Sequence, residues 1–371
     1  MKKITLTIIK ILLTFNFKYN AFSSNNIEFS IAALQPFQVE DSQDSSIYRN
    51  SFETTLYFIL GQFSEKLNKC GYVPNIKFNY FSHEDTPNLK KNALKLENES
   101  TWIILGPNKS EQFLNATKVI KSTLLISGMA NSKEVTNLKW PYFTIYPTNE
   151  KLAQITSAWV DKNEIYKGKY GIITDASCIF CEDFKESYIK YAGTPEFIYE
   201  TDEQLFNTEN LLKELKKHNV NSILLSTYSA LAGKIISGLS KSHFSHIKFI
   251  ANDGFGDDLN LAPYYSIGRE QKVVSIRLGP QKPDSIKILN LENLKMSWND
   301  KVIYPPDEAI YFKDSMNKIT NLLCIHKPKT KTQFNNITKK FSSNYFKTDI
   351  GYGVFEFFDN KFKYKELIKS K

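Results

Sequence analysis

The stretch that decides the fold is TWIILGPNKSEQFLNATKVIKSTLLISGMAN, residues 101–131. An apolar run over 102–105 predicts a buried strand, and the Gly-Pro pair after it predicts a turn. Apolar residues three or four positions apart over 110–121 predict a helix, and a second apolar run over 124–126 predicts another strand. Two short apolar strands joined by one helix form a βαβ unit, which predicts a parallel sheet with helices on both faces.

Small polar residues follow both predicted strands. Ser110 stands after the first strand, and Ser127 begins the loop that runs to Asn131 after the second. In an open α/β sheet, ligands bind outside the carboxyl ends of the strands. We therefore expect Ser110 and the loop 127–131 to contact a ligand.

The same alternation of strand and helix runs through the rest of the chain. Further strands are predicted over 27–34, 75–81, 141–145, 170–174, 196–199, 222–226 and 248–251, with helices such as 182–192 and 203–217 between them. The last part adds a strand over 273–277, helices over 283–298, 306–323 and 331–342, and strands over 353–358 and 362–367. Pro147 marks the point where the pattern starts again. The predicted fold class is α/β, with two similar parallel-sheet lobes.

The order of the elements predicts how the lobes are connected. We assign residues 27–147 and 276–360 to lobe 1, and residues 148–275 and 361–371 to lobe 2. A chain divided in this way crosses between the lobes more than once, so the crossings form a multi-strand hinge. Hinged lobes can close on a ligand.

Residues 1–24 have the order of a secretory signal peptide. A basic start is followed by an apolar run over 4–15 and a small polar end over 21–24, where we expect cleavage. The mature chain is thus expected to be soluble and periplasmic. The net charge of +9 comes mostly from lysines scattered singly, which predicts a solvated surface rather than a nucleic-acid-binding one.

Four cysteines in an exported chain are compatible with two disulfides. Cys178 and Cys181 form a CxxC motif, which is either a local disulfide that stiffens the rim of the cleft or a redox-active pair. Cys70 and Cys324 are either the second disulfide or two free buried thiols.

Several segments in order resemble one known family. They are 104–110 (ILGPNKS), 124–131 (LLISGMAN), 140–147 (WPYFTIYP), 170–175 (YGIITD), 226–228 (STY), 249–254 (FIANDG), 306–311 (PDEAIY) and 353–357 (GVFEF). Together they resemble the type I periplasmic binding proteins, and specifically the branched-chain amino-acid-binding branch of ABC-transporter solute receptors. The resemblance extends from about residue 27 to residue 362.

The resemblance implies a site for an amino-acid zwitterion. Ser110 stands where the family binds the ligand carboxylate, Asp253 where it binds the ammonium, and Tyr228 where a tyrosine contacts the ligand. Asn131 replaces the family's threonine or serine and could donate to a carboxylate or accept from an ammonium. Buried charges need such partners, because an unpaired charge removed from water costs several kcal/mol.

Other positions depart from the family pattern. Met129 stands where a small residue is usual, and Phe180 with Cys181 replaces a Tyr-Gly pair. The loop 36–46 lacks the usual glycines. Met129 and Phe180 would line an apolar part of the pocket, beside Ala130 and Ser127 of the second loop.

Each candidate residue also has a structural interpretation. Ser110 could simply cap a helix, and Asp253 could be an ordinary Asp-Gly turn residue. Tyr228, Met129 and Phe180 could be packing residues.

The sequence supports three hypotheses for function. The first is an exported, monomeric solute receptor, with no catalytic residue, metal or cofactor, that delivers an amino acid to a membrane permease or sensor. The second is a thiol-disulfide enzyme that uses Cys178 and Cys181. The third is a signalling derivative of the same fold that binds no ligand. No HExxH, GxSxG, GxxxxGK[ST] or GxGxxG motif is present.

Overall fold

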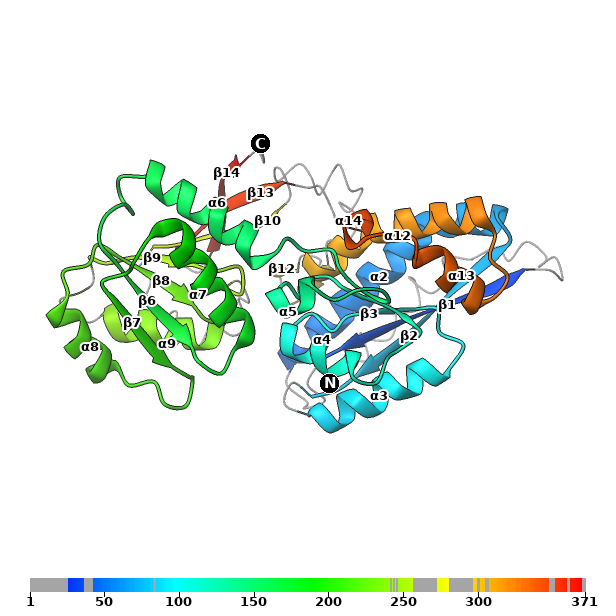
Figure 1. The fold of residues 1–371 in the computed structure, drawn as a ribbon, viewed down its shortest axis with the longest axis horizontal. Helices are drawn as coiled ribbons and strands as arrows, with labels where there is room; N and C mark the ends of the chain where they lie inside the picture. The colour runs from blue at the N-terminus through cyan, green and yellow to red at the C-terminus, as the bar shows by residue number, and fades with distance from the viewer. Residues whose placement is uncertain are drawn as a thin grey trace.

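The computed structural model describes residues 26–36, 43–82, 85–240, 242, 244, 246–255, 272–279, 296–298, 301–303, 307–346, 351–358 and 361–368. These residues form two α/β lobes side by side (Figure 1). The α/β class with two parallel-sheet lobes is therefore confirmed. The predicted signal peptide lies outside the described residues, and so do residues 37–42 of the loop 36–46.

Lobe 1 is built on a five-stranded sheet. Its strands are β1 (Ile27–Gln35), β2 (Tyr72–Tyr80), β3 (Ile103–Leu105), β4 (Leu124–Ser127) and β5 (Tyr142–Thr144), in the order β2-β1-β3-β4-β5. All neighbours pair in parallel. The βαβ unit predicted over 101–131 therefore forms as β3, α4 (Ser110–Thr117) and β4.

Alternating residues of β1 show how this sheet is covered. Phe29 and Ile31 pack in one core cluster with α2 (Gln43–Lys69) and α12 (Asp307–His326). Ala32 and Leu34 face the other way and pack with α3 (Thr86–Asn98) and α4. Successive side chains of a strand point to opposite faces, so a fully apolar strand requires helices on both sides.

Lobe 2 is built on a seven-stranded sheet in the order β14-β13-β10-β9-β8-β6-β7. The strands are β6 (Tyr170–Asp175), β7 (Phe197–Thr201), β8 (Ser222–Ser226), β9 (Lys248–Ala251), β10 (Val273–Leu278), β13 (Tyr352–Phe358) and β14 (Lys361–Ile368). Helices α6 (Asn149–Lys162) and α7 (Ile179–Ala192) share a core with one face, and α8 (Thr208–Lys217) and α9 (Ser229–Ser240) with the other. The edge strand β14 and its neighbour β13 run antiparallel to the strands they pair with.

Strand β13 lies in a different lobe from the one that the sequence predicts. Residues 276–360 were assigned to lobe 1, but β13 pairs with β10 from Val273↔Phe357 to Leu278↔Tyr352 and so joins the sheet of lobe 2. Val354 and Phe357 are buried there. An apolar strand pattern predicts burial but does not specify which sheet supplies the hydrogen-bonding partner.

Several predicted helices also have different bounds. The helix over 203–217 begins at Thr208, because Asn207 accepts hydrogen bonds from the backbone amides of Glu209 and Asn210. The helix over 331–342 is α13 (Lys331–Thr338), followed by the short α14 (Ser343–Phe346). Most of the helix over 283–298 lies outside the described residues, and its end is β11 (Met296–Trp298), which pairs with β12 (Lys301–Ile303).

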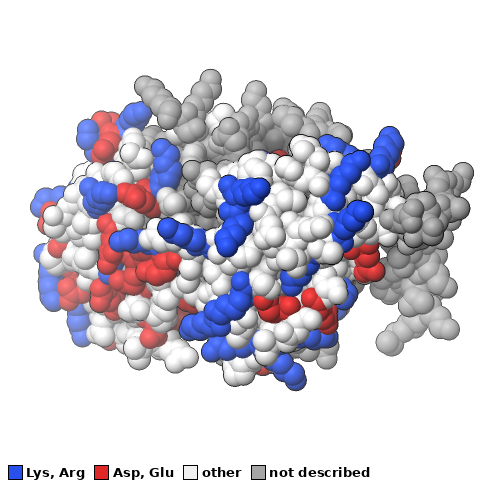
Figure 2. Space-filling model, turned by 45° about the vertical axis from the view of Figure 1, so that its right-hand side comes forward, with Lys and Arg blue, Asp and Glu red and all other residues white. Residues whose placement is uncertain are grey.

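The chain passes between the lobes after β5, after β10 and again before β13, which confirms that it crosses more than once. One core cluster is continuous across both lobes and includes Ile276 of β10 and Tyr311 of α12. Lysines and arginines lie in separate groups over the face shown in Figure 2, with acidic side chains between them. No described helix has the length and apolar character needed to cross a bilayer.

Both predicted cysteine pairs are disulfides. Cys70 and Cys324 join the end of α2 to α12, with Cα atoms 5.2 Å apart. One turn earlier, Lys66 Nζ donates to Asn321 Oδ1 at 2.5 Å between the same two helices. Cys178 and Cys181 close a short loop at the start of α7.

We expect the two disulfides to differ in their effect on stability. Cys70 and Cys324 are 254 residues apart, so the double variant Cys70→Ser/Cys324→Ser should lose about 2–5 kcal/mol of unfolding free energy, because the unfolded chain gains the freedom of a long loop. The matched variant Cys178→Ser/Cys181→Ser opens a separation of 3 residues and should lose clearly less. Urea unfolding followed by circular dichroism measures both. Equal losses would contradict this account.

Candidate functional site

Ser110 lies where the sequence predicted it, at the carboxyl end of β3. It begins α4, and its side chain is 1% exposed. The helix cap is Lys109, and no side chain caps this end. Ser110 Oγ instead accepts a hydrogen bond from the backbone amide of Ser132 at 3.2 Å. The hydroxyl keeps its own proton for a second bond, next to the positive end of a helix dipole.

Ser127 organises the loop that follows β4. Its hydroxyl donates to the Pro107 carbonyl at 2.8 Å and accepts from the amides of Met129 and Ala130 at 3.3 and 2.9 Å. Gly106, just before this contact, has a positive φ of 87°, and a Cβ there would lie 2.3 Å from Gln35 Nε2. The hydrogen-bonding capacity of Ser127 is thus used within the protein, so it shapes the loop.

Asn131 and Asp253 meet across the two lobes. Asn131 follows β4 in lobe 1, Asp253 follows β9 in lobe 2, and Asn131 Nδ2 donates to Asp253 Oδ2 at 3.4 Å. Both side chains are almost fully buried, and Asp253 is 5% exposed. The second carboxylate oxygen, Oδ1, has no hydrogen-bond partner among the described residues. Two positions 122 residues apart in the sequence are therefore brought into one site.

Burial controls the charge of Asp253. Loss of hydration raises its pKa to about 7, although its own backbone amide, the Tyr146 hydroxyl, the Arg277 charge and Asn131 all favour the ionised form. Tyr146 lies between β5 and α6, and Arg277 lies in β10, so both belong to the segments that connect the lobes. A carboxylate in this environment is stabilised by any further cation.

Phe180 and Tyr228 form an aromatic wall in lobe 2. Their rings are stacked with centroids 5.6 Å apart, and Phe180 is buried. Gly254 lies against both rings, since a Cβ on it would be 2.9 Å from Phe180 Cε1 and 3.1 Å from Tyr228 Cδ1. Gly254, which follows Asp253, is thus in contact with the wall. A larger side chain at position 254 would displace the two rings.

The Cys178–Cys181 disulfide supports this wall. Both cysteines cluster with Phe180 and Tyr228, and they are 4% and 0% exposed. Cys178 Sγ accepts from the Cys181 amide at 3.1 Å, and the Cys181 carbonyl accepts from Ser226 Oγ at 2.6 Å. Thiol exchange requires access of a thiolate to one sulfur, and these sulfurs are buried. The disulfide is placed to stiffen the loop that carries Phe180.

Two residues that the sequence did not single out, Asn149 and Asp183, hold the loop that carries Phe180 and connect it to lobe 1. Asn149, at the start of α6, donates through Nδ2 to the Phe180 carbonyl at 3.1 Å and to Asp183 Oδ2 at 2.8 Å. Asp183 also accepts from the Lys133 backbone amide of lobe 1 at 2.8 Å. Burial raises the pKa of Asp183. Asn149 stands two residues after Pro147, where the alternation of strand and helix starts again. This position after the first crossing was the signal in the sequence that could have identified it.

Buried polar atoms without a partner gather around these contacts. Within the described part of the chain, those at the lobe boundary are Ser132 Oγ, Asn149 Oδ1, Thr227 Oγ1, Asn252 Nδ2 and Asp253 Oδ1. In the sequence, each of these residues is one of the site residues described above or lies within two positions of one. Buried polar groups are normally paired, and leaving one unpaired costs about 1–3 kcal/mol. A polar ligand between the lobes would provide such partners.

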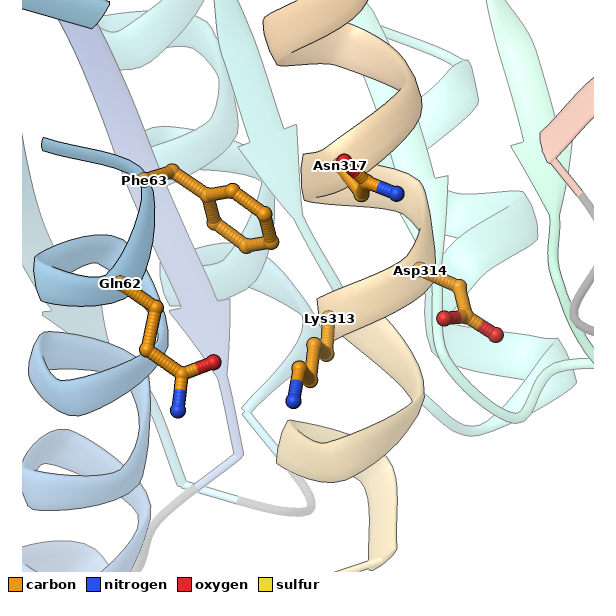
Figure 3. A pocket seen from close by; sticks show the side chains of 5 residues that line it. All are labelled: Gln62, Phe63, Lys313, Asp314 and Asn317. Carbon is orange, nitrogen blue, oxygen red and sulfur yellow. The ribbon is translucent and has the colours of Figure 1, made fainter. Parts of the chain in front are cut away.

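A pocket among the described residues lies elsewhere. It has a volume of about 440 Å³ and opens between α2 and α12 of lobe 1 (Figure 3). Its lining residues are Gln62, Phe63, Lys313, Asp314 and Asn317. None of the predicted site residues lines it. In the described chain, no group of three or more His, Cys, Asp or Glu side chains is arranged to hold a metal ion.

No family model and no curated protein matches the sequence. Solved structures do resemble the fold. The branched-chain amino acid transporter substrate-binding protein LivJ from Streptococcus pneumoniae, in complex with isoleucine, has a TM-score of 0.71 and 15% identity over 92% of this chain and 100% of that chain. The leucine-binding protein LivK from Thermotoga maritima has a TM-score of 0.69 and 11% identity over 92% and 98% of the two chains.

A third similar structure contains a ligand of another chemical class. A solute-binding protein of an ABC transporter from Rhodopseudomonas palustris, in complex with 3,4-dihydroxybenzoic acid, has a TM-score of 0.67 and 14% identity over 92% of this chain and 96% of that chain. At these identities the likeness concerns the fold. This chain has the fold of type I periplasmic binding proteins, and the resemblance to the branched-chain amino-acid-binding branch is confirmed at that level.

Replacing Asp253 should change stability in a pH-dependent way. The folded pKa of about 7 exceeds the ordinary value of 3.8, so the folded state retains a proton that the unfolded chain loses, and stability falls as pH rises from about 4 to 7. We expect Asp253→Asn to be more stable than wild type at pH 8 by about 1 kcal/mol or more, which is a Tm increase of roughly 2–4 °C. The difference should shrink toward pH 4.

Thermal unfolding of both proteins over this pH range measures the effect. Asn131→Asp provides a contrast, because it adds a second buried carboxylate and should lower the Tm at pH 8. An Asp253→Asn variant that is less stable than wild type at pH 8 would show that the ionised carboxylate is well paired in the folded chain.

Proposed function

We propose that this chain is an exported solute receptor whose two lobes close on an α-amino acid and deliver it to an ABC-type permease or a membrane sensor. The observation that carries the proposal is Asp253, buried between the lobes with one carboxylate oxygen unpaired. An α-ammonium group would supply the missing partner. Charged hydrogen bonds of this kind contribute about 1.5–3 kcal/mol each.

The opposite wall suits the carboxylate of the same ligand. The Ser110 hydroxyl has a proton to donate at the start of α4, and the Ser132 hydroxyl is buried without a partner in the described chain. Helix starts favour anions because their backbone amides point outward. Asn131 connects the two walls through its bond to Asp253.

One feature favours an amino acid over an aromatic acid such as the one bound by the Rhodopseudomonas palustris protein. A benzoate carries only negative charge, and above pH 7 it would meet the ionised Asp253. The stacked pair of Phe180 and Tyr228 could accommodate an aromatic ring, so benzoate is the appropriate comparison ligand.

We expect one or more amino acids to raise the Tm of the mature protein. A ligand at one hundred times its Kd adds about 2.7 kcal/mol of stability. Asp253→Asn should abolish the shift because the counter-charge is lost, and Ser110→Ala should weaken binding about tenfold through loss of one hydrogen bond to a carboxylate. Differential scanning fluorimetry and calorimetry measure both.

Lys66→Gln provides a control on the outer face of lobe 1 and should bind as wild type. The proposal would be wrong if no amino acid shifts the Tm, which would favour the signalling derivative, or if benzoate shifts it while amino acids do not. Insulin reduction that depends on Cys178 would favour the redox hypothesis instead.

Amino-acid affinity should also fall in acid. The ligand ammonium stays protonated below pH 8, whereas Asp253 takes up a proton below about 7 and loses its charge. Affinity should decrease roughly tenfold for each pH unit below 7 until the pKa of the bound state is reached. Titration calorimetry between pH 5 and 8 measures this slope. A flat profile would show that Asp253 does not contact the ammonium.

A further inference from the structure

Three carboxylates from separate elements act electrostatically on Tyr228. Glu111 lies in α4 of lobe 1, Asp175 ends β6, and Asp253 follows β9. Burial raises the pKa of the Tyr228 hydroxyl, and the charges of these three carboxylates raise it further. Glu111 Oε1 also accepts a hydrogen bond at 3.5 Å from the amide of Phe180, whose ring stacks on Tyr228.

The negative charge of this group is not balanced by ion pairs. Among the described residues, none of the three carboxylates lies within 4.0 Å of a basic nitrogen. Asp175 and Asp253 are more than nine-tenths buried, and Asp253 Oδ1 has no partner in the same part of the chain. Asp175 Oδ1 accepts two hydrogen bonds from Ser177, at 3.0 and 2.6 Å, but these do not neutralise its charge. One α-ammonium group would compensate Asp253 and leave the charges of Glu111 and Asp175 without a counter-charge.

Lys109 shows where a second cation is stable. Its Nζ atom lies 4.8 Å from the centroid of the Tyr228 ring, reaching from lobe 1 to the aromatic wall of lobe 2. A cation over the face of a tyrosine is favoured by the ring's electrostatic quadrupole, most strongly when both are shielded from water. The protein's own ammonium thus occupies a position that a cationic ligand group could take.

We propose that the ligand is a dibasic amino acid whose side-chain ammonium or guanidinium takes the place of Lys109 Nζ over Tyr228, near Glu111 and Asp175. This inference rests on the proposed function for the α-carboxylate and α-ammonium groups. An apolar side chain would leave these negative charges without a counter-charge when water is expelled from the closing cleft. An acidic side chain would be repelled by them.

Titration calorimetry at pH 8 on the mature protein tests the proposal with L-arginine, L-lysine, L-leucine, L-glutamate and the diamine cadaverine. We expect arginine or lysine to bind at least tenfold tighter than leucine. Glu111→Gln retains the acceptor for the Phe180 amide but removes the charge, so it should weaken arginine or lysine binding about tenfold without weakening that of leucine. Lys109→Gln should strengthen it, because a competing cation is removed.

The matched control is Glu164→Gln, which removes a carboxylate that is 88% exposed and should change no affinity. Preference for leucine would overturn the dibasic assignment while the amino-acid receptor stands. Preference for glutamate that is lost in Lys109→Gln would also overturn it and would make Lys109 an anion anchor. Cadaverine binding that depends on Glu111, without binding of any amino acid, would support the cation position and overturn the proposed function. Absence of all binding would overturn both.

Discussion

A carboxylate buried between two lobes is the constraint on which the rest of the site depends. Asp253 receives one hydrogen bond from Asn131 of the opposite lobe, and burial raises its pKa to about 7. Its own backbone amide, the Tyr146 hydroxyl and the Arg277 charge also favour the ionised form, but together with Asn131 they do not compensate the hydration that the carboxylate loses. The ionised carboxylate therefore carries an electrostatic cost that a cation can remove, and in the receptor that we propose this cost would couple closure of the lobes to binding.

The fold explains why these groups meet. Parallel strands place their carboxyl ends at one edge of a sheet, and the two sheets here turn those edges toward each other. Ser110, Ser127 and Asn131 follow β3 and β4, while Tyr228 and Asp253 follow β8 and β9. The segments that cross between the lobes hold the two edges opposite each other. Tyr146 and Arg277 in those segments lie near enough to favour the ionised form of Asp253.

Rigid and movable parts are separated in this arrangement. The wall made by Phe180 and Tyr228 is held by a disulfide, by Gly254 and by the bond from Ser226 to the Cys181 carbonyl. The contacts between the lobes include the hydrogen bonds that Asp183 accepts from the Lys133 amide and Glu111 accepts from the Phe180 amide. They also include the cation–π contact of Lys109. Bonds of this kind contribute about 1 kcal/mol each, so they can break without loss of either lobe.

The sequence by itself determined the α/β class, the two lobes, both cysteine pairs as possibilities and the strand ends where polar residues stand. Local periodicity and the position of Gly, Pro and small polar residues contain that information, because they reflect the geometry of a single strand or helix. Ser110, Asn131, Tyr228 and Asp253 could be selected in this way, with help from the family resemblance.

Only the tertiary structure decided which of the possible partners each group has. It placed β13 in the sheet of lobe 2, paired Asn131 with Asp253, and brought Lys109, Glu111, Asn149 and Asp183 to the lobe boundary. It also assigned Ser127 to holding its own loop and buried the sulfurs of the CxxC motif. Hydrogen bonds and charges between segments far apart in the chain leave no local pattern, since their energy exists only after the two lobes have packed together.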